Sequence, residues 1–314
     1  MLNLQPAFTN GQAVLFYLMR RIFFTCCILL GTSKFYAQSI QKKVELNLST
    51  GYDRQDLTWS IAGNQAGQNP NIYSELKWKK VGGQSLAAAL QWTVWNKIAL
   101  TGSYSRTFIN TGTVTDNDYN GDNRTNQVYD ETFNADKGHT QAWQLGAGYI
   151  LINNDRFSLT PFVGYGISRQ SLHLLDRTGN FPDLNSTYQT EWKGPFVKAL
   201  ANLRLADKLK LTANVTYNQT NYNAVADWNF IQTFQHPISY RHTAKGFGVD
   251  ANASVAYSIT NNIAINIGGG YYTWQTGNGV DELYLASGGS ERTQLNGVDW
   301  KGYRLFAGVI LSCW

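Results

Sequence analysis

The 314-residue sequence has few charged residues, few cysteines and few long apolar runs, and each shortage limits the fold classes that the chain can adopt. Charged residues make up 15% of the chain, which is low for a soluble protein. Beyond the first forty residues, no apolar run is long enough for a membrane-spanning helix. The chain is instead rich in aromatic residues, at 14%, and contains 29 glycines. This composition indicates β structure and suits a β protein that also faces lipid.

The N-terminal segment has the layout of a secretory signal peptide. Arg20 and Arg21 precede the apolar stretch 22–30, and a short polar region follows it. We expect cleavage between Ala37 and Gln38. The chain is therefore predicted to be exported.

Two domains follow from this prediction, a signal peptide at 1–37 and a mature protein at 38–314. Within the first, we expect Met19 to be the natural start and residues 1–18 to be an extension of the gene prediction. The leader carries three basic residues and no acid, so its removal lowers the net charge from +5 to +2. The remaining balance gives no reason to expect nucleic acid as a partner. Of the 3 cysteines only Cys313 remains, which excludes an intramolecular disulfide.

Strict alternation of apolar and polar residues begins soon after the leader. In "KLKLTANVTY", Leu209, Leu211 and Val215 fall on one face. Thr212 and Asn214 fall on the other, and a period of two predicts a strand. We predict ten such strands, at 42–61, 71–94, 98–113, 139–152, 157–178, 188–205, 208–225, 239–260, 263–277 and 297–314.

The connections between these strands alternate strictly between tight and long. The tight ones lie at 95–97, 153–156, 206–207 and 261–262, and the long polar ones at 62–70, 114–138, 179–187, 226–238 and 278–296. An even number of antiparallel strands, with short turns at one end and long loops at the other, is typical of bacterial outer-membrane barrels. Such a barrel must close, because an open edge in lipid would leave backbone groups unpaired.

We therefore predict an all-β protein of the bacterial outer membrane. Its fold is a closed ten-stranded antiparallel transmembrane β-barrel with long extracellular loops. The alternative is a soluble β-sandwich with one solvated face. A sandwich explains neither the alternating loop lengths nor the shortage of charge on the apolar faces.

The second long loop contains an acidic stretch, "DNDYNGD", that begins at Asp116. Its first six positions, ending at Gly121, match a calcium-binding EF-hand loop. The twelfth position, which should be Glu, is Gln127, and the flanking segments are strands rather than helices. A solvated turn rich in Asp and Asn requires no ligand, and we favour that interpretation. A third interpretation, half of a catalytic site, comes from a family resemblance.

Several short motifs together resemble the omptins, which are outer-membrane barrel proteases, and related outer-membrane proteins. The D-x-D-aromatic run starts at Asp116 in the second long loop, and a further Asp motif, "ADWN", lies in the fourth. "YSELKWK" at Tyr73–Lys79 is similar to the second omptin strand, and "ISYRH" at Ile238–His242 to the start of the eighth. The resemblance spans nearly all of 42–314, with few matched positions.

The resemblance implies a site at the extracellular rim. In omptins an aspartate pair faces an Asp and a His, and a water between them attacks the peptide. The pair falls here on Asp116 and Asp118, and the opposite Asp on Asp227. The His position falls on Asn229, which cannot take up a proton at physiological pH. The first long loop also lacks the acid that omptins carry there.

These departures favour a degenerate protease-type site on a barrel that acts in surface binding or structure. The alternative is an omptin-type aspartyl endopeptidase with a modified active site, and the sequence leaves enzymatic activity open. A diffusion channel is disfavoured, because side chains can largely fill a ten-stranded barrel.

Candidate ligands follow from the same sequence. No phosphate loop and no Cys or His cluster with zinc spacing is found, so no cofactor or metal is predicted. Expected partners are outer-membrane lipid, lipopolysaccharide, and a peptide or protein at the extracellular loops. We expect Asp116, Asp118 and Asp227 to meet at the rim, and His242 to point inward and make an interior hydrogen bond.

Overall fold

The computed structural model describes residues 43–313, which lie within one compact unit, Ile40–Trp314. The predicted signal peptide at 1–37 lies outside the described residues. No helix between residues 43 and 313 is long and apolar enough to cross a membrane. The elements are β1 (Val44–Ile61), β2 (Ser74–Trp95), β3 (Ile98–Gly121), the 3₁₀ helix η1 (Asp122–Arg124), β4 (Thr125–Asn134), β5 (Gly138–Tyr149), β6 (Ile152–Asn153), β7 (Phe157–Leu175), β8 (Asn185–Ala206), β9 (Leu209–Asp227), β10 (Tyr240–Ser258), β11 (Ile263–Thr276), β12 (Gly279–Tyr284) and β13 (Ser290–Cys313).

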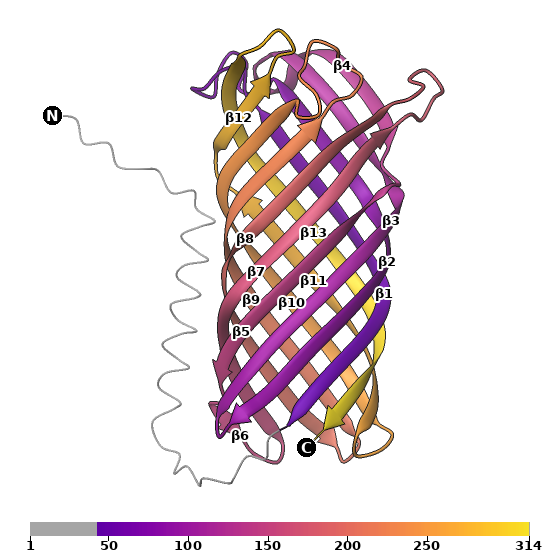
Figure 1. Ribbon diagram of the computed structural model, residues 1–314, viewed down its shortest axis with the longest axis vertical. Helices are drawn as coiled ribbons and strands as arrows, with labels where there is room; N and C mark the ends of the chain where they lie inside the picture. Colours follow the sequence, from indigo (N-terminus) through magenta and orange to yellow (C-terminus); the bar gives the residue numbers. More distant parts are fainter. Residues whose placement is uncertain (1–42, 314) are drawn as a thin grey trace, which may run out of the picture. The chain divides into compact units, whose positions relative to one another are not determined.

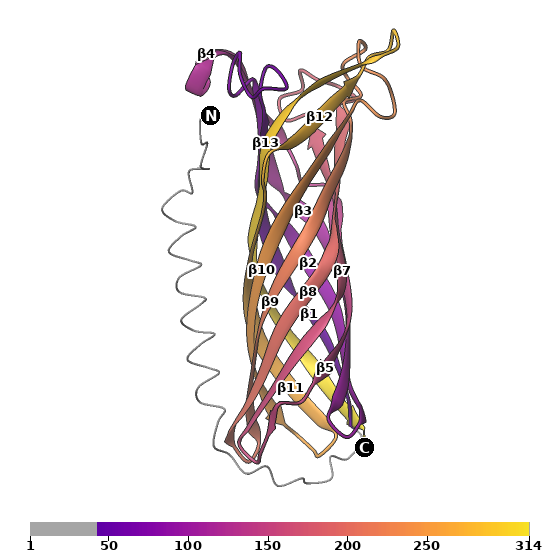
Figure 2. The ribbon, with the colours of Figure 1, turned by 90° about the vertical axis from the view of Figure 1, so that its left-hand side faces the viewer.

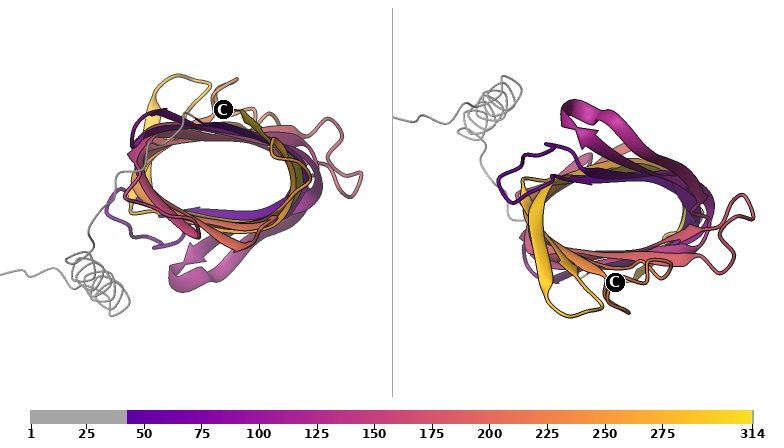
Figure 3. Two further views of the ribbon diagram at one scale, coloured as in Figure 1. Left: turned by 90° about the horizontal axis from the view of Figure 1, so that it is seen from below. Right: turned by 90° about the horizontal axis from the view of Figure 1, so that it is seen from above.

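The strands form one antiparallel sheet that closes on itself into a ring of ten, as predicted (Figure 1). β4, β5 and β6 follow one another along the fourth position, and β11 and β12 share the ninth. Closure comes from β1 and β13, which pair from Val44–Cys313 to Ile61–Leu295. Seen along its axis, the ring is oval (Figure 3). Within residues 43–313, the membrane-spanning part of the ring has no open edge, as lipid requires.

The predicted strand positions are confirmed, but two of the predicted long loops contain further strand. β3 continues through the acidic stretch to Gly121, and β4 returns beside it, so most of 114–138 is a hairpin. The last long loop likewise holds β12 and the start of β13. The missed strands project beyond the apolar band, where both faces of a strand can be polar and the period-two signal is lost.

The outward face carries an apolar band bounded by aromatic residues. Val163, Val215 and Leu305 expose 62%, 53% and 62% of their surface on this face, so the predicted lipid-facing side of β9 is confirmed. Exposed aromatics gather near the short turns and again about half-way along the strands. They include Trp92, Trp95, Tyr149 and Tyr257 in the first group, and Tyr52, Tyr165, Tyr217, Tyr271 and Tyr303 in the second. Such girdles mark the two interfaces of a membrane.

The interior is filled differently in its two halves. Towards the long loops it holds a cluster of buried aromatic and aliphatic side chains, centred on Trp59, Trp78, Tyr188, Trp192 and Tyr222. Towards the short turns it is mainly polar. We call the aromatic cluster the plug. In Figure 2 the strands that carry it continue to the end where β4 and β12 lie.

Candidate functional site

Three carboxylates gather on the inner face of the β3–β4 hairpin. Asp116 lies directly opposite Glu131 in the pairing of the two strands, and Asp118 lies opposite Tyr129. Residues directly opposite in an antiparallel pair share a face. Val114 and Phe133, on the same face one step further down, are buried in the plug. We call Asp116, Asp118 and Glu131 the rim acidic cluster.

These acids face inward because two irregularities reverse the strand faces. Lower in β3 the even-numbered residues, such as Tyr104 and Phe108, are exposed on the outside. Lys80 in β2 and Gly112 in β3 have positive φ angles of 57° and 140°, and the pairing of the two strands shifts between them. Such a bulge turns the following residues to the other face. At Gly112 a Cβ would also lie 2.8 Å from Cγ2 of Val81, so glycine suits the position.

The electrostatics of the rim acidic cluster disfavour full ionisation. Burial, and then the neighbouring Asp118, raise the pKa of Asp116 to about 8. Burial also raises the pKa of Asp118, against a hydrogen bond from Ser74 that lowers it. Burial and the charges of Asp116, Glu131 and Asp118 raise the pKa of Tyr129 to about 12. Tyr129 therefore stays a phenol, and Asp116 holds its proton at neutral pH.

Nearby cations are already committed to another acid. Arg124, at the hairpin tip, donates from Nε and Nη2 to the two carboxylate oxygens of Glu75, at 3.0 and 2.6 Å. Lys77 also forms an ion pair with Glu75. Although burial acts to raise the pKa of Glu75, these cations hold it below its usual value. The tip is fixed further where the Asn71 amide donates to Asp122 at 2.8 Å.

A chain of buried polar groups lies within the plug. The Tyr188 hydroxyl is 2.6 Å from that of Tyr222 and 2.8 Å from Nδ1 of His242. Nε2 of His242 lies 3.1 Å from Oδ1 of Asp281, at ion-pair distance but off the hydrogen-bond direction. Thr293 donates to the other oxygen of Asp281. The predicted inward position and interior hydrogen bond of His242 are confirmed, since its exposed fraction is 0%.

Tyr240 interacts electrostatically with both the buried polar groups of the plug and the rim acidic cluster. Its side chain is 6% exposed, and its hydroxyl has no hydrogen-bond partner within the described structure. Its ring packs against Trp59, Trp228 and His242. Burial raises its pKa well above the usual value, and the charges of Asp116 and Asp281 add to this rise. Tyr240 thus lies within the electrostatic reach of both acids.

The other two predicted site residues lie elsewhere. Asp227 ends β9 on the same parity as Val215 and Tyr217, on the outward face. Its carboxylate is 2.6 Å from Nδ1 of His236, whose Nε2 is 3.2 Å from the Ile231 carbonyl. The expectation that Asp227 meets Asp116 and Asp118 is therefore not met.

Asn229 serves a loop connection. Its carbonyl oxygen accepts from the Asn185 amide and the Ser186 hydroxyl, each at 3.0 Å. Its amide nitrogen donates to the Asp183 carbonyl at 3.0 Å. All three bonds hold the 226–238 loop to the start of β8. Asn229 therefore has a structural role at the position where the family resemblance places a histidine.

Calcium ligation finds no support at the acidic stretch. The stretch forms two strand ends and the short helix η1 rather than a loop wrapped round an ion. Among residues 43–313, no three or more His, Cys, Asp or Glu side chains are grouped to hold a metal ion. Within this stretch, the predicted solvated turn is limited to Asp122–Arg124, none of which is buried.

Comparison with known proteins now places the chain. The sequence model described as "Pom: Protochlamydia outer membrane protein" matches residues 47–311. The chain belongs to the Pom family. No curated protein matches it in sequence.

One solved structure has the fold of this Pom-family protein. The outer membrane protease OmpT of Escherichia coli is similar, with a TM-score of 0.71, 15% identity, and coverage of 90% of this chain and 100% of the other. The translocator domain of the autotransporter NalP of Neisseria meningitidis gives a TM-score of 0.38 and 10% identity, over 96% and 97% of the chains. The attachment protein Ail of Yersinia pestis gives 0.26 and 10%, over 85% and 98%. The family match and the OmpT structure show that the Pom-family protein is an outer-membrane β-barrel with the omptin fold, and the predicted location is confirmed.

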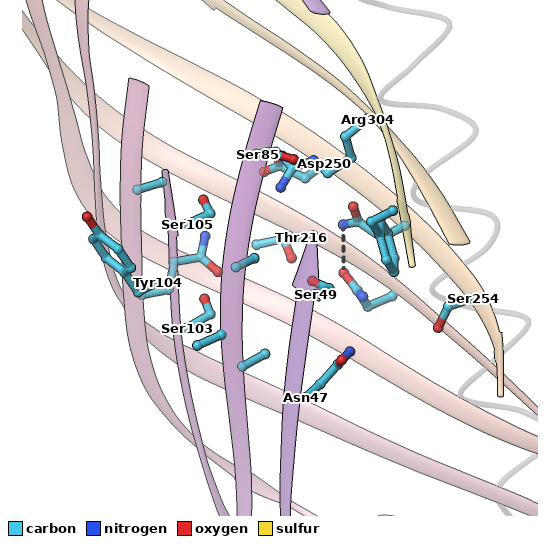
Figure 4. A pocket seen from close by; sticks show the side chains of 18 of the residues that line it. Asn47, Ser49, Ser85, Ser103, Tyr104, Ser105, Thr216, Asp250, Ser254 and Arg304 are labelled. Atoms are coloured by element: carbon cyan, nitrogen blue, oxygen red, sulfur yellow. Dashed lines mark hydrogen bonds between the residues drawn. The ribbon is translucent and has the colours of Figure 1, made fainter. Parts of the chain in front are cut away.

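The Pom-family barrel also encloses a polar cavity of about 310 Å³. Its lining combines charges of both signs with small polar side chains, as Figure 4 shows for Asp250, Arg304, Ser49 and Thr216. Asp250 accepts hydrogen bonds from Asn218 and Trp274 at 2.7 and 3.3 Å. These contacts tie the lining to the barrel wall, and the alternating sequence pattern does not predict this cavity.

Sequence reasoning also missed Glu131, Tyr129, Tyr240 and Asp281. Glu131 and Tyr129 lay in a segment expected to be loop, although Tyr129 and Phe133 in "QVYDETF" share one parity. Tyr240 stood two residues before His242, on the inward parity, so its position could have been inferred. The pairing of Asp281 with His242 depends on β12, which was not predicted.

Proposed function

We propose that this Pom-family barrel is a non-catalytic surface-binding protein whose rim acidic cluster receives a cationic group of a partner. The site is a degenerate form of the omptin arrangement. The observation that carries the proposal is the separation of the predicted catalytic residues. Asp116 and Asp118 face inward, while Asp227 is bonded to His236 on the outer face.

The chemistry of the cluster suits a cation. Asp116 and Glu131 oppose each other as like charges, which is unfavourable unless a proton or a cation lies between them. A bound ammonium or guanidinium group favours the ionised form of Asp116 and displaces its proton. Binding should therefore strengthen as the pH rises through about 8, the pKa of free Asp116.

A direct test uses purified, refolded protein with lipopolysaccharide and a fluorescent Lys- and Arg-rich peptide. We expect binding that weakens about tenfold in the double variant Asp116→Asn, Glu131→Gln, since two charge-assisted contacts are lost. Asp155→Asn with Asp207→Asn, at two exposed short turns, is the matched control for the loss of two carboxylates. An equal loss in the control, or no binding at all, would refute the proposal.

The second candidate is an omptin-type endopeptidase with a modified active site. It is favoured by the 3.1 Å approach of His242 to Asp281, and by the effect of the Asp116 charge on the pKa of Tyr240. The same peptides, assayed for cleavage, separate the two functions. Cleavage lost in both Asp116→Asn and His242→Gln, but retained in His236→Ala, would favour the enzyme.

We also propose a contact with lipopolysaccharide on the outer wall. Arg169 and Lys193 flank Glu191, each with a 2.7 Å ion pair, on the outward face beyond the apolar band. Lys245 and Lys301 are exposed on the same face of their strands. Cations at this height suit the phosphates of an outer-leaflet glycolipid. Lys193→Gln with Lys245→Gln should weaken binding of lipopolysaccharide micelles, whereas Lys97→Gln, beside the short turn, should not.

A further inference from the structure

The upper part of the β3–β4 hairpin leaves one sheet edge unpaired. β4 pairs with β3 along its whole length, from Thr125 to Asn134. On its other side it meets β7 at a single position, Asn134 opposite Leu175. Thr125–Phe133 therefore has a partner strand on one side only. Viewed along the axis, this hairpin lies outside the opening of the ring (Figure 3).

The unpaired edge is reachable. Every residue of Thr125–Val128 is exposed, and Val128 exposes 58% of its surface. Val128 is also the extra residue of a bulge, because Tyr119 pairs with Gln127 while Asp118 pairs with Tyr129. Below the bulge the strand is regular. An exposed strand edge with free N–H and C=O groups is a template for another strand.

The charge of the hairpin restricts what can pair with it. Between residues 113 and 134 there are five carboxylates, Asp116, Asp118, Asp122, Asp130 and Glu131. Arg124 is the single basic residue in that range, and it is bound to Glu75. A second copy of the same edge would be repelled by these acids. An extended segment bearing Lys or Arg would be attracted.

We propose that β4 accepts an extended, basic segment of a partner polypeptide as an added strand. The inference rests on the proposed binding function and names the class of partner and its mode of binding. The added main chain would take up those edge-facing groups of Thr125–Phe133 that have no partner, which excludes the Tyr129 carbonyl bonded to the Gln127 side chain. Its inward side chains would lie about 4.8 Å from Glu131 and about twice that from Asp116, within reach of a lysine or arginine.

Strand addition makes a prediction that a simple charge contact does not. In an added strand, every second backbone amide points to the edge.

We would use a peptide of about eight residues, with Lys at alternate positions and Thr between, since this matches a typical strand. Two further versions carry N-methyl groups on the Lys amides or on the Thr amides. A slip of one residue cannot rescue the blocked version, because it would turn the lysines to the other face.

We expect the parent peptide and one methylated version to bind alike, and the other to bind about tenfold or more weakly, as several hydrogen bonds are lost. Amide exchange within Thr125–Phe133 should slow about fivefold or more on binding. The edge at Ser290–Thr293, which pairs with β12 alone, is the internal control and should not change.

The failures of the two proposals are distinguishable. Equal binding by both methylated versions, still lost in Asp116→Asn with Glu131→Gln, would overturn strand addition and leave the cation-binding function standing. Absence of binding by all three peptides would overturn both. If exchange slowed at Ser290–Thr293 and not in β4, the peptide would be pairing with β13. That result would overturn the inference.

Discussion

Asp116 on β3 and Glu131 on β4 lie directly opposite each other on the inner face of the hairpin that rises from the barrel wall. Two ionised carboxylates at such positions would destabilise the strand pair, and the proton that Asp116 keeps at neutral pH removes part of this repulsion. The bonds at its tip, from Arg124 to Glu75 and between Asn71 and Asp122, supply part of the compensation. Such an arrangement is expected where a ligand, rather than the fold, needs the acids.

The first prediction concerns pH and Asp116. A folded-state pKa of about 8, above the ordinary 3.8, means that the folded hairpin holds the proton more tightly than the unfolded one. Its stability should therefore fall as the pH rises from about 4 to about 8. Asp116→Asn should flatten this dependence and stabilise the hairpin at pH 8 by about 1–3 kcal/mol. Amide exchange of residues 113–134 across this pH range measures it. An unchanged slope would show that Asp116 is not the titrating group.

The second prediction compares two buried tyrosines. Tyr188→Phe removes a hydroxyl bonded to Tyr222 and His242, and should lower the free energy of unfolding by about 1–3 kcal/mol. Tyr240→Phe removes a hydroxyl without a described partner, and should be neutral or stabilising. Urea unfolding followed by tryptophan fluorescence provides both values. The reverse order would mean that Tyr240, not Tyr188, holds the polar chain together.

The third prediction tests the facing of β9. Val215→Arg places a charge in lipid and should make folding into vesicles less favourable by about 2–4 kcal/mol. Asn214→Arg places the same charge beside the polar cavity, where Asn214 already bonds to Asn252, and should be tolerated better. Equal effects of the two variants on folding would contradict the assigned faces.

The fourth prediction concerns Asn229. The family resemblance alone suggests that Asn229→His restores a protease site. Its three loop hydrogen bonds, and the outward position of Asp227, predict the opposite. Asn229→His should give no peptide cleavage and should speed exchange of the Asn185 amide, which donates to Asn229. Asn180→His, in the exposed loop before β8, is the control for a new imidazole at the rim. Cleavage that appears in Asn229→His and disappears on adding Asp227→Asn would show that the loop rearranges into an active form.

The fold could be read from the sequence because lipid forces every spanning strand to alternate. Val215 and Asn214 are distinguishable by that rule alone. The outward position of Asp227 was in principle readable too, since it has the parity of Val215 on the same strand.

The inward position of Asp116 was not readable in this way. Counting by two from Phe108 places Asp116 outside, and only the irregularities at Lys80 and Gly112 reverse it. A bulge depends on the register of two strands, which a single strand's pattern does not specify. The plug contact between His242 and Asp281 likewise required knowing that β12 lies beside β10.

The pairing of β1 with β13 determines how this protein can be made. It joins Val44 to Cys313, so the first strand of the barrel waits for the last strand before it gains its second neighbour. Contacts this distant in sequence make folding slow, and an unfinished ring exposes two adhesive edges. Assembly is therefore all-or-none with respect to the final segment. A chain shortened within β13 loses the seam as a whole, and should be degraded rather than inserted as a smaller barrel.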